Sequence, residues 1–415
     1  MNTTITEATR IAGLVADRLA TPEQGRALAG SRWWPQSLAH GAAGVALLHI
    51  ERARTGHGPW ERVQRWLECA VAEGVDSSPN AHLYYGAPAV AFVLHRAAAV
   101  HPGYGGELAR LDRAVGLIVA SRLERAHARM DAGGLALLAE FDTVRGLTGL
   151  GALLLARDPQ GPLLRGLLAY LVRLTEPVTV QGRALPGWWS PVGPDGKKNA
   201  AFPGGHANTG MAHGIAGPLA ILAAALRRKI AVKGHTEAIT RILDWLDTWQ
   251  RTSPSGAWWP YWVTHDQIDG ARTLVGPQRP SWCYGAAGVA HAQMLAADAL
   301  GDHRRYATAR STLARVFTDT PLSSTALDFS LCHGLAGLAV LARTTALGDA
   351  PGLWAVLRGG DSAAVADRLL TEAGIGLLEG AAGIATALHT LHTPSPDMGW
   401  TAFFLLDHQE HHRDG

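Results

Sequence analysis

The sequence predicts an all-α fold, an α/α-toroid in which seven helical hairpins form an inner and an outer ring of helices. A short glycine motif returns seven times, and an apolar stretch of helical character follows each copy. Amphipathic segments lie between the copies, so that each repeat comprises two helices. Of the 415 residues, 47% are hydrophobic and 48 are glycines, a composition that favours closely packed helices.

The repeated motif has the form HGAAG. Its seven copies are His40–Gly44, Tyr85–Ala89, Arg145–Gly149, His213–Gly217, Tyr284–Gly288, His333–Gly337 and Glu379–Gly383. The first glycines are separated by 45, 60, 68, 71, 49 and 46 residues, and a period near 45 accommodates two helices and two connections. Glycines at i and i+3 lie on one helix face, where we expect neighbouring backbones to approach closely. This favours a closed ring, with an open superhelix as the alternative.

Four segments between the motifs show the apolar spacing i, i+3, i+4, i+7 that is typical of outer, amphipathic helices. They are residues 60–74, 106–126, 235–250 and 304–317. Two longer inserts, residues 176–212 and 251–281, are rich in Trp, Pro and Gly and predict long loops or short hairpins over one end of the ring. Long loops on a rigid scaffold often carry binding sites. No linker separates these parts, so we expect residues 1–415 to form a single domain.

The charge and cysteine content exclude several classes of protein. There are 37 Lys and Arg against 35 Asp and Glu, and a net charge of +2 is not the footprint of a nucleic-acid-binding protein. Three cysteines cannot form a disulfide framework. The sequence shows neither a signal peptide nor an apolar run of transmembrane length. We therefore expect a cytoplasmic protein.

Alignment of the motifs places one residue directly before each first glycine, at the start of an inner helix. These residues are His40, Tyr85, Arg145, His213, Tyr284, His333 and Glu379. One position earlier, two consecutive repeats carry Cys283 and Cys332. Equivalent positions in a ring converge on its axis, so Cys283, Cys332 and His333 form a candidate metal set. Two thiolates and an imidazole select zinc, and three protein ligands leave a fourth position open, as catalytic sites require.

The other cysteine and histidines are less specific. A free cysteine is most often a small buried hydrophobe, and we interpret Cys69 in this way. His213 has the motif position without a neighbouring cysteine, and we interpret it as an acid/base group. His40 has the same position in a repeat with no other chemical feature, so a structural and a functional role stay open for it. The histidine-rich residues 407–415 are interpreted as a flexible tail rather than a metal site.

Three stretches, GMAHGIAGPLA (210–220), SWCYGAAGVA (281–290) and LCHGLAGLAV (331–340), together resemble lanthionine synthetase C, the family of lantibiotic cyclases. The resemblance runs through all seven repeats. It implies an α/α-toroid with a single zinc ion held by Cys283, Cys332 and His333. The implied activity is the addition of cysteine thiols of a dehydrated precursor peptide to dehydroalanine or dehydrobutyrine, which forms (methyl)lanthionine thioether rings.

By position, the resemblance also implies catalytic roles for five residues. His213 matches the family's acid/base histidine, and Asp142 and Arg279 match its aspartate and arginine. Trp282 and Tyr284 match its aromatic residues. In this interpretation His213 handles the proton that Cα receives, Asp142 orients an imidazole, and Arg279 holds Asp142 or steadies the enolate. From the residues alone, a helix cap for Asp142 and a solvated loop charge for Arg279 remain as alternatives.

The resemblance implies partners as well: the lanthipeptide precursor with its leader and core, a lantibiotic dehydratase and an exporter, the last two placing the protein at the membrane periphery. A family cyclase also carries a small SH2-like domain, for which we locate no equivalent in the sequence. Two other functions compete. A zinc protein prenyltransferase needs an aspartate ligand and a basic cluster for diphosphate, which these motifs lack. A non-catalytic protein that binds zinc and a thiol such as glutathione stays open.

Overall fold

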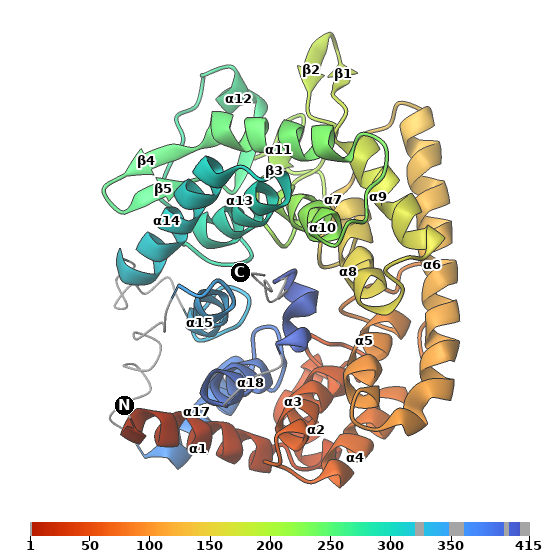
Figure 1. Cartoon of the computed structure of the whole chain (residues 1–415), viewed down its shortest axis with the longest axis vertical. Helices are drawn as coiled ribbons and strands as arrows, with labels where there is room; N and C mark the ends of the chain where they lie inside the picture. The colour runs from red at the N-terminus through yellow and green to blue at the C-terminus, as the bar shows by residue number, and fades with distance from the viewer. Residues whose placement is uncertain (1, 320–327, 348–360, 394–397, 407–415) are drawn as a thin grey trace, which may run out of the picture.

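The structure is a computed structural model that describes residues 2–319, 328–347, 361–393 and 398–406. Within these ranges an inner helix follows each of the seven motifs. The inner helices are α3 (Ala42–Arg54), α5 (Ala87–Ala98), α8 (Leu147–Arg157), α10 (Ala216–Arg227), α13 (Ala286–Leu300), α15 (Leu335–Thr344) and α18 (Ala381–His392). They surround a common axis (Figure 1). The all-α toroid that the sequence predicts is confirmed.

The outer layer pairs with the inner helices in the order of the chain. Its main helices are α4 (Trp60–Val71), α6 (Gly105–Asp131), α9 (Pro162–Leu174), α11 (His235–Trp249), α14 (His303–Asp319) and α17 (Ser362–Ala373). Shorter helices lie between them: α2 (Pro22–Ala29), α7 (Leu138–Phe141), α12 (His265–Ile268), and the 3₁₀ turns η1 (Gly30–Arg32) and η2 (Pro102–Tyr104). All four predicted outer segments are helical. Inner helices such as α10 are apolar on every side because both layers cover them.

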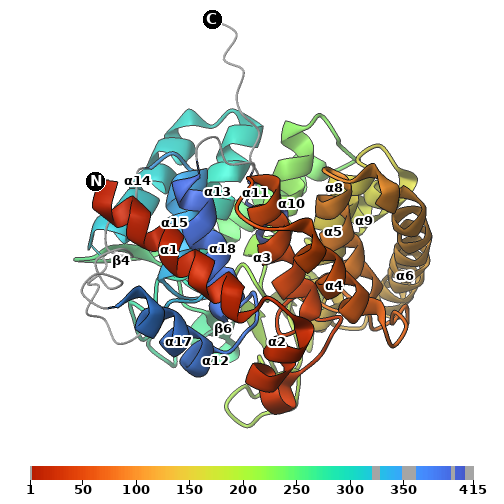
Figure 2. The same cartoon turned by 90° about the horizontal axis from the view of Figure 1, so that it is seen from below.

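The first and the last repeats meet, so the ring is closed. The inner helix α18 packs against α3, and the N-terminal helix α1 (Asn2–Arg18) lies along α18 and α17 (Figure 2). An ion pair between Arg18 and Asp367 links α1 to α17, with Nε and Oδ1 2.9 Å apart. Because exposed ion pairs contribute little, the buried apolar face of α1, with Ile11, Ala12 and Val15, provides most of the closure. The open superhelix is therefore excluded.

The two motif glycines act differently from the sequence-based expectation. In six of the seven repeats the first glycine is the residue that precedes the helix rather than part of its face, and at Gly86 and Gly285 its φ is positive (74° and 109°), which favours glycine. The second glycine faces the loop of its own repeat. A Cβ on Gly288 or Gly337 would collide with the carbonyl oxygen six residues earlier. The close approach is thus mainly between helix and loop, not between neighbouring helices.

The loops that precede the inner helices form a hydrogen-bonded belt around the axis. The amide of Cys283 donates to the carbonyl of Cys332 (3.2 Å), and the amide of Cys332 donates to the carbonyl of Leu378 (3.0 Å). On the other side of Cys283, the amide of Ala212 donates to the carbonyl of Cys283 (3.2 Å), and the amide of Thr143 donates to the carbonyl of Ala212 (3.0 Å). Three of these four bonds join equivalent residues of consecutive repeats, which is why side chains at matched motif positions come together.

The C-terminal segment fills the centre of the inner ring, which the sequence did not indicate. Its 3₁₀ helix η3 (Gly399–Phe404) lies inside the ring, with Trp400 and Phe403 fully buried (Figure 1). The hydroxyl of Tyr84 donates to the carbonyl of Phe403 (3.0 Å), and the indole of Trp282 donates to that of Phe404 (3.0 Å). Residues 407–415, which the sequence suggests to be a tail, lie outside the described residues.

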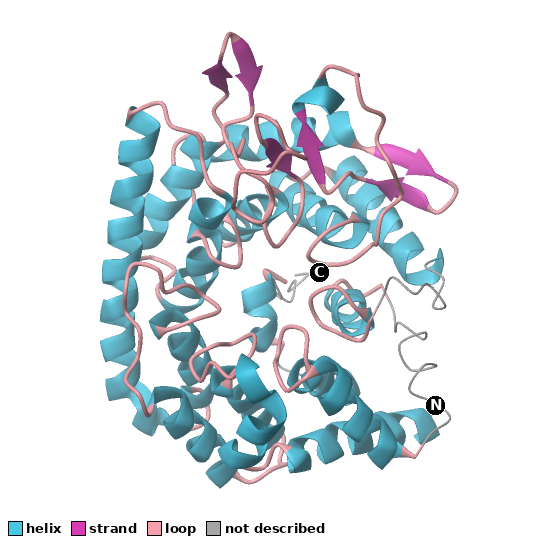
Figure 3. Ribbon diagram, turned by 180° about the vertical axis from the view of Figure 1, so that it is seen from behind, coloured by secondary structure: helices cyan, strands magenta, loops and turns pink. Residues whose placement is uncertain are grey.

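All strands of the described residues lie in the two inserts, gathered at one edge of the ring (Figure 3). Strands β1 (Val178–Val180) and β2 (Arg183–Leu185) form one hairpin, and β4 (Arg251–Ser253) and β5 (Gly256–Trp258) form another. Strand β3 (His206–Asn208) pairs antiparallel with β6 (Trp262–Thr264), so the first insert is joined to the second. Among the described helices, none is both long and apolar enough to span a membrane.

Candidate metal centre and active site

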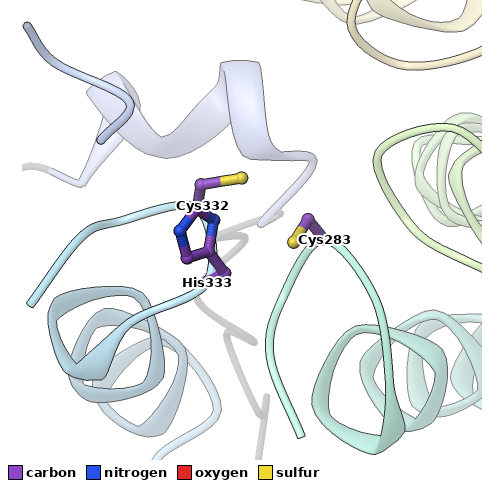
Figure 4. A group of neighbouring side chains, drawn as sticks. All are labelled: Cys283, Cys332 and His333. Carbon is purple, nitrogen blue, oxygen red and sulfur yellow. The ribbon is translucent and has the colours of Figure 1, made fainter. Parts of the chain in front are cut away.

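Cys283, Cys332 and His333 come together at the inner ends of two neighbouring loops (Figure 4). Their potential ligand atoms all lie within 4.8 Å of one another, and both cysteines are buried while His333 is half-buried. The belt bond between the backbones of Cys283 and Cys332 fixes this proximity. Within the described residues, no other group of three or more His, Cys, Asp or Glu has metal-binding geometry. Two sulfurs and an imidazole nitrogen at this spacing fit a zinc ion.

The electrostatics of the two thiols also fit a cation. The hydrogen bond with Cys332, supported by His333 and Ser281, lowers the pKa of Cys283. The hydrogen bond with Cys283, together with burial, raises the pKa of Cys332. Two adjacent buried thiols therefore do not ionise together on their own. A dication bound between them would favour the thiolate form of both.

Asp328 orients His333, a partner that the motif alignment missed. Its Oδ2 lies 2.9 Å from Nε2 of His333, which leaves Nδ1 as the nitrogen for a metal. The other oxygen, Oδ1, accepts from the amide of Ser330 (2.8 Å). The hydrogen bond with Asp328, followed by that with Cys283, raises the pKa of His333 to about 9. A carboxylate bound to the second nitrogen of a ligand imidazole is the usual support of zinc sites.

We predict that Asp328→Asn weakens zinc binding by about 10- to 100-fold, because the imidazole loses its orienting carboxylate. Competition with a fluorescent zinc chelator measures the affinity. The matched control is Asp269→Asn, which changes an exposed carboxylate of the second insert that pairs with Arg183 of the first, and it should leave the affinity unchanged. An unchanged affinity in Asp328→Asn would show that His333 is held by other contacts.

His213 and Asp142 form a hydrogen-bonded pair beside Cys283, Cys332 and His333, the three residues that we call the triad. Nδ1 of His213 lies 2.7 Å from Oδ2 of Asp142, whose side chain is 1% exposed, whereas that of His213 is 33% exposed. The other oxygen of Asp142 accepts from the amides of Arg145 (2.6 Å) and Gly146 (2.8 Å) at the start of α8. These two amides precede the first residue of α8, and Gly146 is its N-cap residue, so Asp142 is not a helix cap: one oxygen fixes the loop before α8 and the other binds an imidazole.

The environment of His213 suits a proton carrier. Burial alone would lower the pKa of its imidazole, but the hydrogen bond and the charge of Asp142 raise it above its ordinary value. The nearby thiol of Cys283 acts in the same direction. Since Nδ1 is held by Asp142, Nε2 is the nitrogen available to a substrate. The belt also connects the two centres, because the amide of Ala212 donates to the carbonyl of Cys283.

The two matched aromatic residues lie in different surroundings. Tyr284 is half-buried, its ring centroid is 6.1 Å from that of His213, and its hydroxyl accepts from the amide of Asn208 (3.2 Å). Trp282 is 2% exposed, bonded to Phe404 and packed edge-on against the ring of that residue at 4.4 Å. Tyr284 is thus placed beside the acid/base pair, while the contacts of Trp282 are those of a core side chain that anchors η3.

Arg279 and His40 lie at the edge of this arrangement. The side chain of Arg279 interacts with Tyr261 and its charge acts on Cys332, while the contacts described for Asp142 are with His213 and the start of α8.

His40 packs edge-on against Trp34 at 5.6 Å, beside a small pocket that Arg32 and Gly374 also line. Burial lowers the pKa of His40, against the opposing charge of Glu379. Cys69 is half-buried on α4, and burial raises the pKa of its thiol.

Comparison with known proteins agrees with this geometry. A family model described as "Lanthionine synthetase C-like protein" matches residues 32–347, which contain the triad and the His213–Asp142 pair. The chain belongs to this family. Among solved structures similar to it is one described as "Nisin cyclase", with a TM-score of 0.73 and 20% sequence identity over 94% of this chain and 96% of that chain. That likeness shows the lanthionine synthetase C-like fold. No curated protein matches the sequence.

Proposed function

We propose that the protein is a zinc-dependent peptide cyclase that forms (methyl)lanthionine rings. In such a reaction the sulfur of a substrate cysteine adds to the β-carbon of a dehydroalanine or dehydrobutyrine in the same peptide. The S–Cβ bond forms, the carbon–carbon double bond becomes an enolate, and a proton is delivered to Cα. The observation that carries the proposal is the placement of a Cys₂His triad and a His–Asp pair on one belt of loops.

The triad would hold the metal ion. A free thiol, with a pKa near ~8.5, is mostly protonated at neutral pH. Zinc bound by Cys283, Cys332 and His333 would supply the Lewis acidity that keeps a substrate cysteine in its thiolate form. Asp328 fixes the imidazole of His333 through Nε2, and the belt fixes the two cysteine backbones.

His213 is proposed as the general acid. Its Nε2 can deliver a proton to Cα of the enolate, and Asp142 stabilises the imidazolium while holding the ring through Nδ1. Of the two roles considered for Arg279, steadying the enolate oxygen agrees better with its position near Tyr261 and Cys332. Tyr284, beside His213, would border the reacting groups, and Trp282 would act through its packing against η3.

Incubation with a dehydrated precursor peptide tests this function. Ring closure makes the peptide unreactive toward thiol-alkylating reagents without changing its mass, and fragmentation of the product locates the thioether. A protein that only binds zinc and a thiol would retain the peptide with its cysteines still alkylatable, which would contradict the proposal. Precursors encoded beside the protein are the first substrates to test, with the dehydratase and the exporter as the proposed partners.

A further inference from the structure

Four half-buried aromatic side chains form a continuous surface next to His213, which we call the aromatic wall. It consists of Phe202 from the first insert, Tyr261 and Trp262 from the second, and Tyr284 from the fifth motif. Ring centroids of successive members lie 5.0 to 6.1 Å apart: Phe202–Trp262 5.5 Å, Trp262–Tyr284 6.1 Å and Tyr261–Tyr284 5.0 Å. These distances are those of packed aromatic pairs.

The wall is held in place from both inserts. Asn208 on β3 is paired with Trp262 on β6, and its buried amide donates to the hydroxyl of Tyr284 (3.2 Å). The hydroxyl of Tyr261 donates to the carbonyl of Arg279 (3.1 Å), and its own carbonyl accepts from the amide of Thr209 (3.0 Å). The surface therefore depends on the β3–β6 pairing, which places residues of two distant segments side by side.

Packing of the inserts alone does not explain why the four rings of the wall are only half-buried. The same segments bury three other tryptophans, Trp188, Trp189 and Trp259, at 2% exposure or less, and the indoles of the last two donate to backbone carbonyls. Those side chains form the core of the inserts. The wall rings instead keep part of their surface accessible, and the wall ends at Tyr284, which lies beside His213 and next to Cys283 in the chain, where the proposed substrate would react.

We propose that the aromatic wall receives the dehydroamino acid of the substrate peptide before ring closure. The inference rests on the proposed function. A dehydroamino acid is planar and conjugated, so it presents a flat π surface that packs well against aromatic faces, whereas its saturated counterpart has a tetrahedral Cα. Tyr284 lies between the two centres, in sequence next to Cys283 and in space beside His213. A dehydroamino acid packed against Tyr284 would therefore lie close to both the acid and the metal ligands.

The test compares two precursor peptides by calorimetry, both with every cysteine replaced by alanine so that no thiol takes part. One contains dehydrobutyrine and the other contains 2-aminobutyrate at the same positions. We expect the unaltered protein to bind the unsaturated peptide about five- to tenfold more tightly. In the Phe202→Ala, Trp262→Ala double variant this preference should disappear, while the zinc content stays the same. Trp60→Ala, a half-buried aromatic on the outer helix α4, should keep the preference.

Equal binding of the two peptides to the unaltered protein, or an undiminished preference in the double variant, would overturn the inference. If the double variant does not fold, Trp262→Leu keeps an apolar side chain without the π face and should still reduce the preference. The measurement involves no ring formation. A preference without thioether formation would therefore count against the proposed function alone, and thioether formation without a preference would count against the wall alone.

Discussion

Replacement of both Cys283 and Cys332 by alanine should remove zinc from the purified protein and abolish controlled ring closure. With the two thiolates gone, His333 alone does not hold the metal, and the substrate thiol returns to its ordinary pKa near ~8.5. At pH 7 only about 3% of such a thiol is ionised, so we expect the rate to fall by at least about 30-fold. Metal analysis and thioether formation on one sample measure the two effects.

The third cysteine provides the control. Cys69→Ser changes a half-buried thiol on the outer helix α4, and it should alter neither zinc content nor ring formation. Circular dichroism should show the helical content of both variants unchanged, because alanine is tolerated at small buried positions. Full zinc retention in the Cys283→Ala, Cys332→Ala protein would refute the metal assignment.

His213→Ala should separate catalysis from metal binding. The side chain is paired with Asp142 and does not belong to the triad, so the variant should keep its full zinc content and near-normal stability. Ring closure should slow by about 10²- to 10⁴-fold, as expected for loss of a general acid. Some cyclisation without stereochemical control should persist, because thiols add slowly to dehydroalanine unaided. Zinc content and ring formation are measured on the same protein.

The role of His213 as a general acid also predicts the direction in which activity changes with pH. A general acid must be protonated, so activity falls as pH rises through the pKa of His213, which Asp142 raises. Asp142→Asn should therefore shift this falling limb to lower pH, while the asparagine oxygen can still accept from the amides of Arg145 and Gly146. A loss of zinc in step with activity in His213→Ala would make this residue a ligand. Normal activity in that variant would move the acid elsewhere, with His40 as the next candidate.

The parts of the fold that could be predicted from the sequence are those encoded locally. Each repeat carries its own glycine motif and apolar period, so the inner and outer helices follow from short windows. The closure by α1 and the central position of η3 could not be predicted in this way, because both depend on contacts between segments far apart in the sequence. The role of the second glycine was misjudged for a similar reason: its neighbour, a loop carbonyl six residues earlier, is not visible in helical periodicity.

The same distinction holds for the candidate site: residues that share a motif position could be predicted from the sequence, and the others could not. The triad is predictable because Cys283 and Cys332 share one offset from the motif and the belt makes equal offsets neighbours. Asp328 lies four residues before Cys332. No other motif has an aspartate at the equivalent position, so the alignment of the motifs did not mark it. The only hint was an aspartate shortly before a CHG sequence. The two contacts of Asp142, with the loop before α8 and with an imidazole, could not be read from the sequence, where a helix cap explains an aspartate at that position equally well.

The placement of η3 has a consequence for how a long peptide is processed. Trp400, Phe403 and Phe404 are buried inside the inner ring of helices, so that, within the described residues, η3 occupies the middle of the toroid. Under the proposed function, a precursor peptide would therefore reach and leave the candidate site without passing through the middle of the toroid. The order of thioether rings would then follow from successive docking events rather than from directional translocation, and a finished thioether ring would not have to pass between the inner helices.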